Sequence, residues 1–103
     1  MYQNEFQEIV NHRRSNRSFD VNCDVPGEVI ERCLRNAILS PNSSNLQLWE
    51  FQWIESPELL QKLIPLCLGQ SAAKTAKHMV VFITRKDKWR ERAKWNYERI
   101  KEG

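Results

Sequence analysis

Residues 25–55 read VPGEVIERCLRNAILSPNSSNLQLWEFQWIE, and the first half of this stretch has the pattern of an amphipathic helix. Apolar residues recur there at three-and-four spacing, which places them on one helical face. These positions are Val29, Ile30, Cys33, Leu34, Ala37 and Ile38. Pro26 suits a first helical turn, whereas Pro41 disfavours helical geometry in the residue before it. We therefore expect a helix between the two prolines, with Cys33 in the core.

The second half of the stretch predicts a polar loop followed by a strand. Phe51 and Trp53 alternate with polar residues, so residues 49–55 should form a half-buried strand. Residues 78–84, HMVVFIT, are an almost continuous apolar run that suits a central strand covered on both faces. We interpret His78 as structural, because no carboxylate or second His lies at ligand or relay spacing.

Four further helices are expected from periodicity and start signals. They cover residues 6–12, 57–64, 70–77 and 89–100. Ser56 supplies a cap for the second of these, and Pro57 suits its first position. The last has an apolar stripe, which we interpret as the packing face of a solvated helix. Its positions are Trp89, Ala93, Asn96, Tyr97 and Ile100. The sequence thus predicts an α+β fold of two strands and four to five helices.

Composition fits a folded domain, with 41% hydrophobic and 28% charged residues. No apolar run approaches the roughly 18 residues of a membrane span, and the polar, acidic N-terminus is unlike a secretion signal. We therefore expect a cytoplasmic protein without a membrane partner. The three cysteines lack Cys-x-x-Cys spacing, so neither a disulfide framework nor a metal site is supported.

The first polar segment of interest follows the helix that ends near His12. Arg13, Arg14, Ser15 and Arg17 lie within five residues there. Arginine offers a planar fork of donors that matches phosphate oxygens and stays charged, and serine adds a short neutral donor. On residue chemistry alone, the segment is either a ligand site for phosphate or a solvated basic turn.

The second polar segment is the loop at residues 41–49, PNSSNLQLW. Asn and Gln side chains each carry a donor and an acceptor, so they can match the alternating N–H and C=O groups of a pyrimidine-like ring edge. The alternative is a helix-to-strand loop whose polar residues only satisfy turns. The presence of both segments together favours the ligand interpretation.

The two segments resemble motifs of the flavin-dependent nitroreductase family. In that family an Arg-Arg-Ser-x-Arg-like segment is followed by Ala-Pro-Ser-x-x-Asn-x-Gln-Pro-Trp and then a strand. Their order, distance and flanking helix agree here, although Leu48 stands at a family Pro position and Asn42 where Ser is common. The resemblance covers nearly all of this chain but only the N-terminal half of the family pattern. It implies one partial nitroreductase-like domain over residues 1–103, contributing to a mixed sheet flanked by helices.

The resemblance implies an FMN site in which the first segment holds the phosphate. Arg13 and Ser15 would bind the phosphate, and Arg14 would lie along the ribityl and phosphate region. Arg17 would reach the pyrimidine edge of the isoalloxazine. Gln70, which precedes the second strand, matches a family position that contacts the flavin ring.

The loop residues would act across a homodimer, because family members build each flavin site at the subunit interface. Residues that would approach the flavin bound mainly by the other subunit are Pro41, Asn42, Ser43 and Asn45. Gln47 and Trp49 occupy family positions that mainly shape and support the loop.

The implied function is that of an FMN-dependent oxidoreductase with NADH or NADPH as hydride donor. Its acceptors would be nitroaromatic, quinone or similar electron-poor small molecules, and no side chain is assigned as general acid or nucleophile. One alternative is a flavin-free fragment of the fold that serves as a structural or interaction unit. Another is an anion or nucleic-acid binding module, suggested by the basic turn at residues 13–17 and a basic C-terminal helix; the net charge of +3 is modest. We favour the flavoprotein and expect no nucleic-acid partner.

Overall fold

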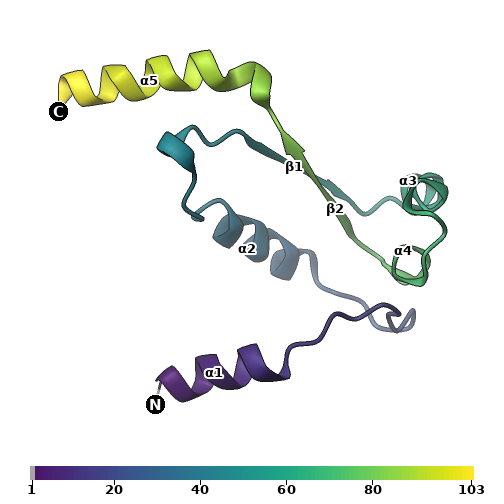
Figure 1. Ribbon diagram of the computed structural model, residues 1–103. Coiled ribbons are helices and arrows are strands. Elements are labelled where there is room, and N and C mark those ends of the chain that lie inside the picture. The colour runs from purple at the N-terminus through teal and green to yellow at the C-terminus, as the bar shows by residue number, and fades with distance from the viewer. Residues whose placement is uncertain (1) are drawn as a thin grey trace.

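The sheet of this protein consists of two antiparallel strands, β1 (Trp49–Ile54) and β2 (Met79–Thr84), as the computed structural model in Figure 1 shows. The structure describes residues 2–103, with side chains from residue 5 onward. Phe51 lies opposite Phe82, and their rings meet edge to face with centroids 5.0 Å apart. This geometry is favourable for an aromatic pair. Both predicted strands are confirmed to within one residue at their ends.

Five α-helices accompany the strands within residues 2–103. They are α1 (Tyr2–His12), α2 (Gly27–Ala37), α3 (Pro57–Leu63), α4 (Ser71–Thr75) and α5 (Trp89–Glu102). Short 3₁₀ turns lie in the connections, namely η1 (Ser43–Asn45), η2 (Pro65–Cys67) and η3 (Lys86–Lys88). The predicted α+β class and the number of elements are confirmed. None of the helices in this part of the chain is long and apolar enough to cross a membrane.

The strand pair separates two groups of helices (Figure 1). α3 and α4 lie together beyond one end of the sheet, whereas α5 continues from the other end of β2. α2 leads through η1 into β1, and its first residue, Gly27, lies against Trp53. A Cβ atom at Gly27 would come within 3.3 Å of the indole ring. The missing side chain therefore allows α2 to start close to β1.

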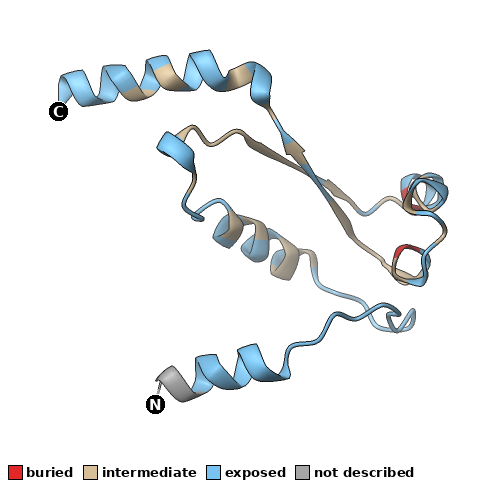
Figure 2. Cartoon of the chain, viewed as in Figure 1, coloured by how far each residue is buried: buried red, intermediate tan, exposed pale blue. Residues whose placement is uncertain are grey.

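The chain forms an open layer with very little interior. Its radius of gyration is 18.0 Å, against about 13 Å for a closed domain of this length. Its accessible surface is 9143 Å², against about 6,100 Å² for a folded monomer of this mass. Only Leu60 in α3 and Ala73 in α4 are buried among the described side chains, and they are the red positions in Figure 2. Even a large apolar side chain such as Phe6 in α1 is 68% exposed, because no other element within residues 2–103 packs on it.

Two expectations about burial are wrong for the described part of the chain. β2 is not covered on both faces, since Phe82 is 75% exposed. Cys33 is exposed on α2 rather than buried in a core. The apolar periodicity predicts helix and strand correctly, but burial also needs an element packed on the apolar face. Residues 2–103 do not supply that element for these two positions.

Three helix predictions need smaller corrections. α2 ends at Ala37 instead of running to Pro41, because residues 38–40 tighten into a turn in which Leu39 N–H bonds to the Asn36 carbonyl. α4 occupies only Ser71–Thr75 of the predicted 70–77. Ser56 sits at the N-cap position of α3, but its hydroxyl donates to the Glu58 carboxylate at 2.9 Å and does not cap the helix backbone.

Candidate functional site

The polar loop between α2 and β1 is closed on itself by hydrogen bonds, and we call residues 41–48 the amide loop. The Asn42 side-chain oxygen accepts the Gln47 backbone N–H at 2.8 Å. The Gln47 side-chain nitrogen donates to Asn45 Oδ1 at 3.2 Å, and the Asn45 N–H donates to the Asn42 carbonyl at 3.2 Å. The predicted turn-forming role of these amides is therefore part of the structure.

The amide loop also contains three non-glycine residues in the left-handed region. Ser44, Asn45 and Gln47 each have φ of 51°. This conformation costs on the order of 1 kcal/mol or more per residue, and it collects at ligand clamps and active sites. Asparagine tolerates it better than most residues. The loop thus holds a specific, unfavourable backbone shape that its hydrogen bonds must maintain.

Two contacts from distant parts of the sequence hold the amide loop from outside. Asn96 on α5 donates from Nδ2 to the Ser44 carbonyl at 2.6 Å. Arg85, at the end of β2, donates its backbone N–H to the Leu48 carbonyl. Our sequence interpretation missed both, although a signal for Asn96 existed: it is a polar residue within the apolar stripe of α5.

The Arg85 side chain holds the start of β1, the strand that follows the amide loop. Its guanidinium binds the Asp87 carboxylate at 3.0 Å and the Glu50 carboxylate at 3.2 Å. These hydrogen bonds, which Arg85 donates to Asp87 and to Glu50, raise the pKa of Arg85 above its ordinary value, with the bond to Asp87 as the larger cause. The hydrogen bond from Arg85 correspondingly lowers the pKa of Asp87. The pairing ties β1, β2 and η3 together beside the loop.

The basic segment, residues 13–17, follows α1, and all five of its residues are exposed. The Arg13 N–H continues the helix by bonding to the Ile9 carbonyl at 2.9 Å. Arg14 donates from its guanidinium to the Asn11 carbonyl at 3.0 Å, so it caps the end of α1. Among the hydrogen bonds and ion pairs of the described residues, none uses the side chain of Arg13, Ser15 or Arg17. These side chains therefore keep their donors available for a ligand.

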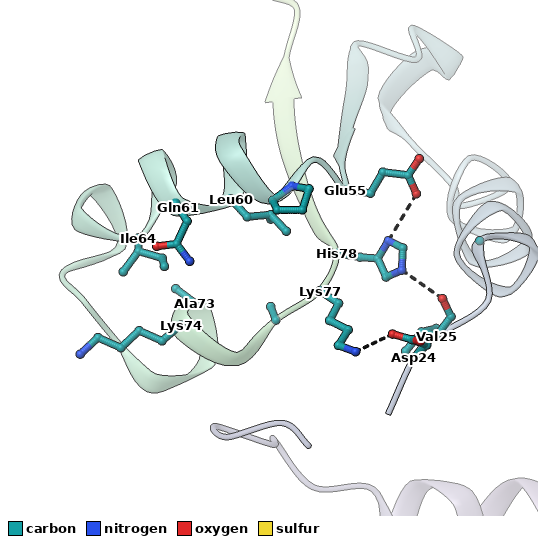
Figure 3. Close-up of a pocket in the computed structure, with 13 residues that line it drawn as sticks. Asp24, Val25, Glu55, Leu60, Gln61, Ile64, Ala73, Lys74, Lys77 and His78 are labelled. Atoms are coloured by element: carbon teal, nitrogen blue, oxygen red, sulfur yellow. Dashed lines mark hydrogen bonds and ion pairs between the residues drawn. The ribbon is translucent and has the colours of Figure 1, made fainter. Parts of the chain in front are cut away.

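The chain that follows the basic segment is attached to α4 and to the start of β2. The Phe19 N–H donates to the Thr75 hydroxyl at 2.9 Å. Lys77 forms an ion pair with Asp24, and this hydrogen bond lowers the pKa of the Asp24 carboxyl. Figure 3 shows Lys77 and Asp24 facing each other across the gap between the two segments. The attachment brings the basic segment to the side of the molecule that carries α4.

His78 completes this attachment. Trp53 donates its indole N–H to His78 Nδ1 at 3.1 Å. Nδ1 is therefore an acceptor, and the hydrogen-bond network assigns the ring proton to Nε2, which lies 3.0 Å from the Val25 carbonyl. The predicted structural role of His78 is confirmed by these bonds. The sequence spacing does not reveal one carboxylate that the fold brings near, since Glu55 lies 3.9 Å from Nδ1 (Figure 3).

A cavity of about 530 Å³ lies between this attachment, α3 and α4 (Figure 3). Charged and polar side chains on its wall include Asp24, Glu55 and Lys77, which already pair within the protein. Its lining contains no residue of the basic segment or of the amide loop. We therefore do not assign the predicted ligand to this cavity.

The sequence-predicted residues form two groups. The amide loop, which begins at Pro41, follows the C-terminal end of α2. The basic segment follows the C-terminal end of α1 (Figure 1). No hydrogen bond among the described residues joins them. Gln70 is exposed at the N-cap position of α4. The predicted site residues therefore lie mainly in two separate groups on one chain, the amide loop and the basic segment, which we call the candidate half-sites.

The chemistry of both half-sites fits a flavin mononucleotide. The unused guanidinium donors of the basic segment suit a phosphate dianion. In the amide loop, Asn42 is committed to the loop backbone, while the Ser43 hydroxyl, Asn45 Nδ2 and Gln47 Oε1 make no bond within the described chain. These groups offer both donors and an acceptor, as a ring edge of alternating N–H and C=O requires.

Comparisons with known proteins identify the family of this chain. Residues 10–102 match the sequence profile of the Nitroreductase family. The Bacillus subtilis (strain 168) protein YdgI, named as an NAD(P)H nitroreductase, is 35% identical over 80 residues, which are 78% of this chain and 38% of YdgI. Iodotyrosine deiodinase 1 of Pongo abelii is 33% identical over 75 residues, which are 73% of this chain and 26% of that protein. The chain thus spans well under half the length of these relatives.

Solved structures share the fold. A nitroreductase-like protein from Streptococcus mutans superposes with a TM-score of 0.74 at 21% identity, covering 99% of this chain and 57% of that one. A nitroreductase from Exiguobacterium sibiricum 255-15, solved in complex with FMN, superposes with a TM-score of 0.72 at 30% identity and covers 91% and 47% of the two chains. The motifs, the fold and the profile match lead to one conclusion: this chain belongs to the nitroreductase family.

Proposed function

We propose that this chain forms half of each flavin site in an FMN-dependent NAD(P)H oxidoreductase of the nitroreductase type. When bound, FMN supplies electron transfer from a reduced nicotinamide to an electron-poor acceptor. The observation that carries the proposal is the pair of half-sites, an unengaged basic segment and a preformed amide loop, in a chain of this family. The similarity to a protein solved with FMN supports the choice of cofactor.

The basic segment would bind the phosphate end of the cofactor. Arg13 and Ser15 supply unused donors, and a charge-assisted hydrogen bond to phosphate is stronger than a neutral one. Arg14 would extend along the ribityl region while its guanidinium also caps α1. Arg17 would reach the pyrimidine edge, where its positive charge favours negative charge on the ring.

The amide loop would bind the ring edge of a flavin held mainly by a second copy of the chain. Asn45 and Ser43 supply the free donors, while Asn42, Gln47 and Pro41 shape the loop. The basic segment and the amide loop are separate within one chain and share no hydrogen bond among the described residues. This separation supports a homodimer with the site between subunits. Gln70 would approach the ring from α4. Sedimentation equilibrium should therefore give twice the 12.3 kDa mass of the chain.

The acceptor class is the finer part of the proposal. We propose nitroaromatic, quinone or related electron-poor acceptors, with NADH or NADPH as the donor, following the name of the YdgI relative. A second candidate is reductive dehalogenation, which the similarity to iodotyrosine deiodinase 1 favours. The cytoplasmic location expected from the sequence stays a prediction.

The proposal is tested by the visible absorbance spectrum of the purified chain together with identification of the released cofactor. We expect bound FMN at about one per chain after reconstitution with excess FMN. Oxidation of NADH and of NADPH should then be followed with a nitroaromatic, a quinone and an iodotyrosine as acceptors. The acceptor that gives the highest kcat/KM separates the two candidate functions.

The result that would contradict the proposal is a folded chain without bound flavin. A chain that is folded by circular dichroism but retains no FMN at a large excess would contradict the flavoprotein assignment. The flavin-free structural or interaction fragment would then be the better description of residues 1–103.

A further inference from the structure

Asn96 is placed by the fold against a part of the amide loop that has left-handed backbone geometry. It lies in the middle of α5 and is half-buried, unlike the charged residues around it. Its Nδ2 atom is 2.6 Å from the Ser44 carbonyl oxygen, across 52 residues of sequence. Among the side-chain hydrogen bonds of residues 5–103, this one connects α5 with the loop.

The peptide unit between Ser44 and Asn45 is hydrogen-bonded at both of its polar groups, the carbonyl and the N–H. The Ser44 carbonyl accepts from Asn96, and the N–H of the same peptide, which belongs to Asn45, donates to the Asn42 carbonyl at 3.2 Å. A peptide unit is planar, so fixing both ends fixes its orientation. The plane is bounded on one side by ψ of Ser44, which is 22°, and on the other by the left-handed φ of Asn45, which is 51°. Rotation of the plane would change both angles, so it would release the left-handed φ of Asn45 and redirect the Asn45 side chain.

We propose that Asn96 is a positioning residue for the flavin half-site, which acts by holding the Ser44–Asn45 peptide in the orientation that aims Asn45 at the ring edge. The proposal rests on the proposed function for the identity of the ligand. The role in the loop rests only on the contacts within this chain. α5 is thereby part of the site, although none of its residues belongs to either sequence motif.

The chemistry explains why the position carries an asparagine. A carbonyl oxygen needs a donor, and the Asn amide supplies one on a short, stiff side chain. Two other members of the apolar stripe, Ala93 and Ile100, lie one turn away on either side of Asn96 on the same helix. An Asp at position 96 would keep the shape but turn an acceptor toward the Ser44 carbonyl. It is therefore the sharpest single test.

The experiment compares Asn96→Asp with Asn36→Asp, a matched change on the exposed face of α2, and with Asn96→Gln. The first readout is hydrogen exchange of the Asn45 and Gln47 amides by NMR, without flavin. We expect exchange at Asn45 to rise at least fivefold in Asn96→Asp, and to stay unchanged in Asn36→Asp. Asn96→Gln should recover part of the protection, because it retains an amide donor. Thermal unfolding of each variant verifies that the fold is kept.

The second readout concerns the ligand and uses FMN as the probe. Loss of one well-formed hydrogen bond predicts a rise of about three- to tenfold in the FMN Kd of Asn96→Asp. The visible circular dichroism of bound FMN should also change, which a general loss of stability would not produce. Asn36→Asp should match the wild type in both measurements.

Three results would overturn parts of the inference separately. Unchanged exchange at Asn45 in Asn96→Asp would overturn the positioning role itself. If exchange increases but FMN affinity and the dichroism of bound FMN stay unchanged, Asn96 holds the loop but does not contribute to flavin binding. A wild-type chain that binds no FMN would refute the proposed function, while the exchange measurement would still decide whether Asn96 holds the loop.

Discussion

The two half-sites of this chain are built in opposite ways. The amide loop is closed by its own side chains, held by Asn96 and Arg85, and kept in a left-handed backbone shape. The basic segment is exposed, and two of its three guanidinium groups make no hydrogen bond or ion pair among the described residues. On the proposed function, the loop would be preorganised for a directional ring edge. The basic segment would instead supply charge, which can bind a phosphate without strict geometry.

The largest expected effect comes from removing charge in the basic segment. Arg13→Ala would remove the proposed hydrogen bond to the phosphate, and a bond to a charged group is worth about 1.5–3 kcal/mol, so the Kd for FMN should rise about 10- to 100-fold. The thermal midpoint should stay the same, because the Arg13 side chain supports nothing else within the described chain. Fluorescence titration of FMN measures the change. Arg32→Ala on α2 is the matched control, and equal affinities for these two variants would count against the phosphate assignment.

A smaller effect should follow from opening the amide loop. Asn42→Ala removes the acceptor of the Gln47 N–H, a hydrogen bond worth about 1 kcal/mol. We expect faster exchange of the Gln47 amide and an increase of several-fold in the FMN Kd. Asn42→Asp retains the acceptor oxygen, so it should restore the protection of Gln47. If Asn42→Asp and Asn42→Ala exchange alike, the hydrogen bond does not hold the loop.

The smallest effect concerns the attachment of the basic segment and depends on pH. The pKa of Asp24 is lowered by its hydrogen bond from Lys77. A depressed folded pKa means that the pair stabilises the fold above the unfolded value of about 3.9, and that this contribution is lost as pH falls through the folded pKa. Urea unfolding of Asp24→Asn should thus differ from the wild type at pH 7, and the difference should vanish under strong acid. Glu98→Gln on α5 serves as the control, and a difference that persists in acid would contradict the ion pair.

The sequence predicts the local elements well, because their periods are local properties. The three-and-four spacing of α2 and the alternation of β1 are properties of neighbouring residues. Both polar motifs are also continuous along the chain, so their residues can be named from the order of amino acids alone. Arg13 and Asn45 are examples of such residues.

The remaining features depend on contacts between distant residues. Ile54 pairs with Met79, so Glu55 comes opposite His78 only once the antiparallel register is known. The bond from Asn96 to Ser44 likewise needs the placement of α5 relative to the loop. Exposure of Phe82 could not be predicted either, since an apolar strand is buried only where another element packs on it.

The short helix α1 has a thermodynamic consequence for ligand binding. α1 has 11 residues, whereas isolated helices shorter than about 12–15 residues are marginal in water. Its exposed Phe6 and Ile9 offer apolar surface that a second element would have to cover. The extent to which the helix is populated therefore depends on what packs against it.

The basic segment receives its geometry from the last turn of α1, through the bonds of Arg13 to Ile9 and of Arg14 to Asn11. A phosphate ligand that requires this turn has an apparent Kd equal to the intrinsic Kd divided by the fraction of molecules in which the helix is formed. On the proposed function, phosphate affinity would thus be linked to the coverage of α1. A partner that covers Phe6 and Ile9 would raise cofactor affinity by stabilising the helix, in addition to any contact that it makes with the cofactor.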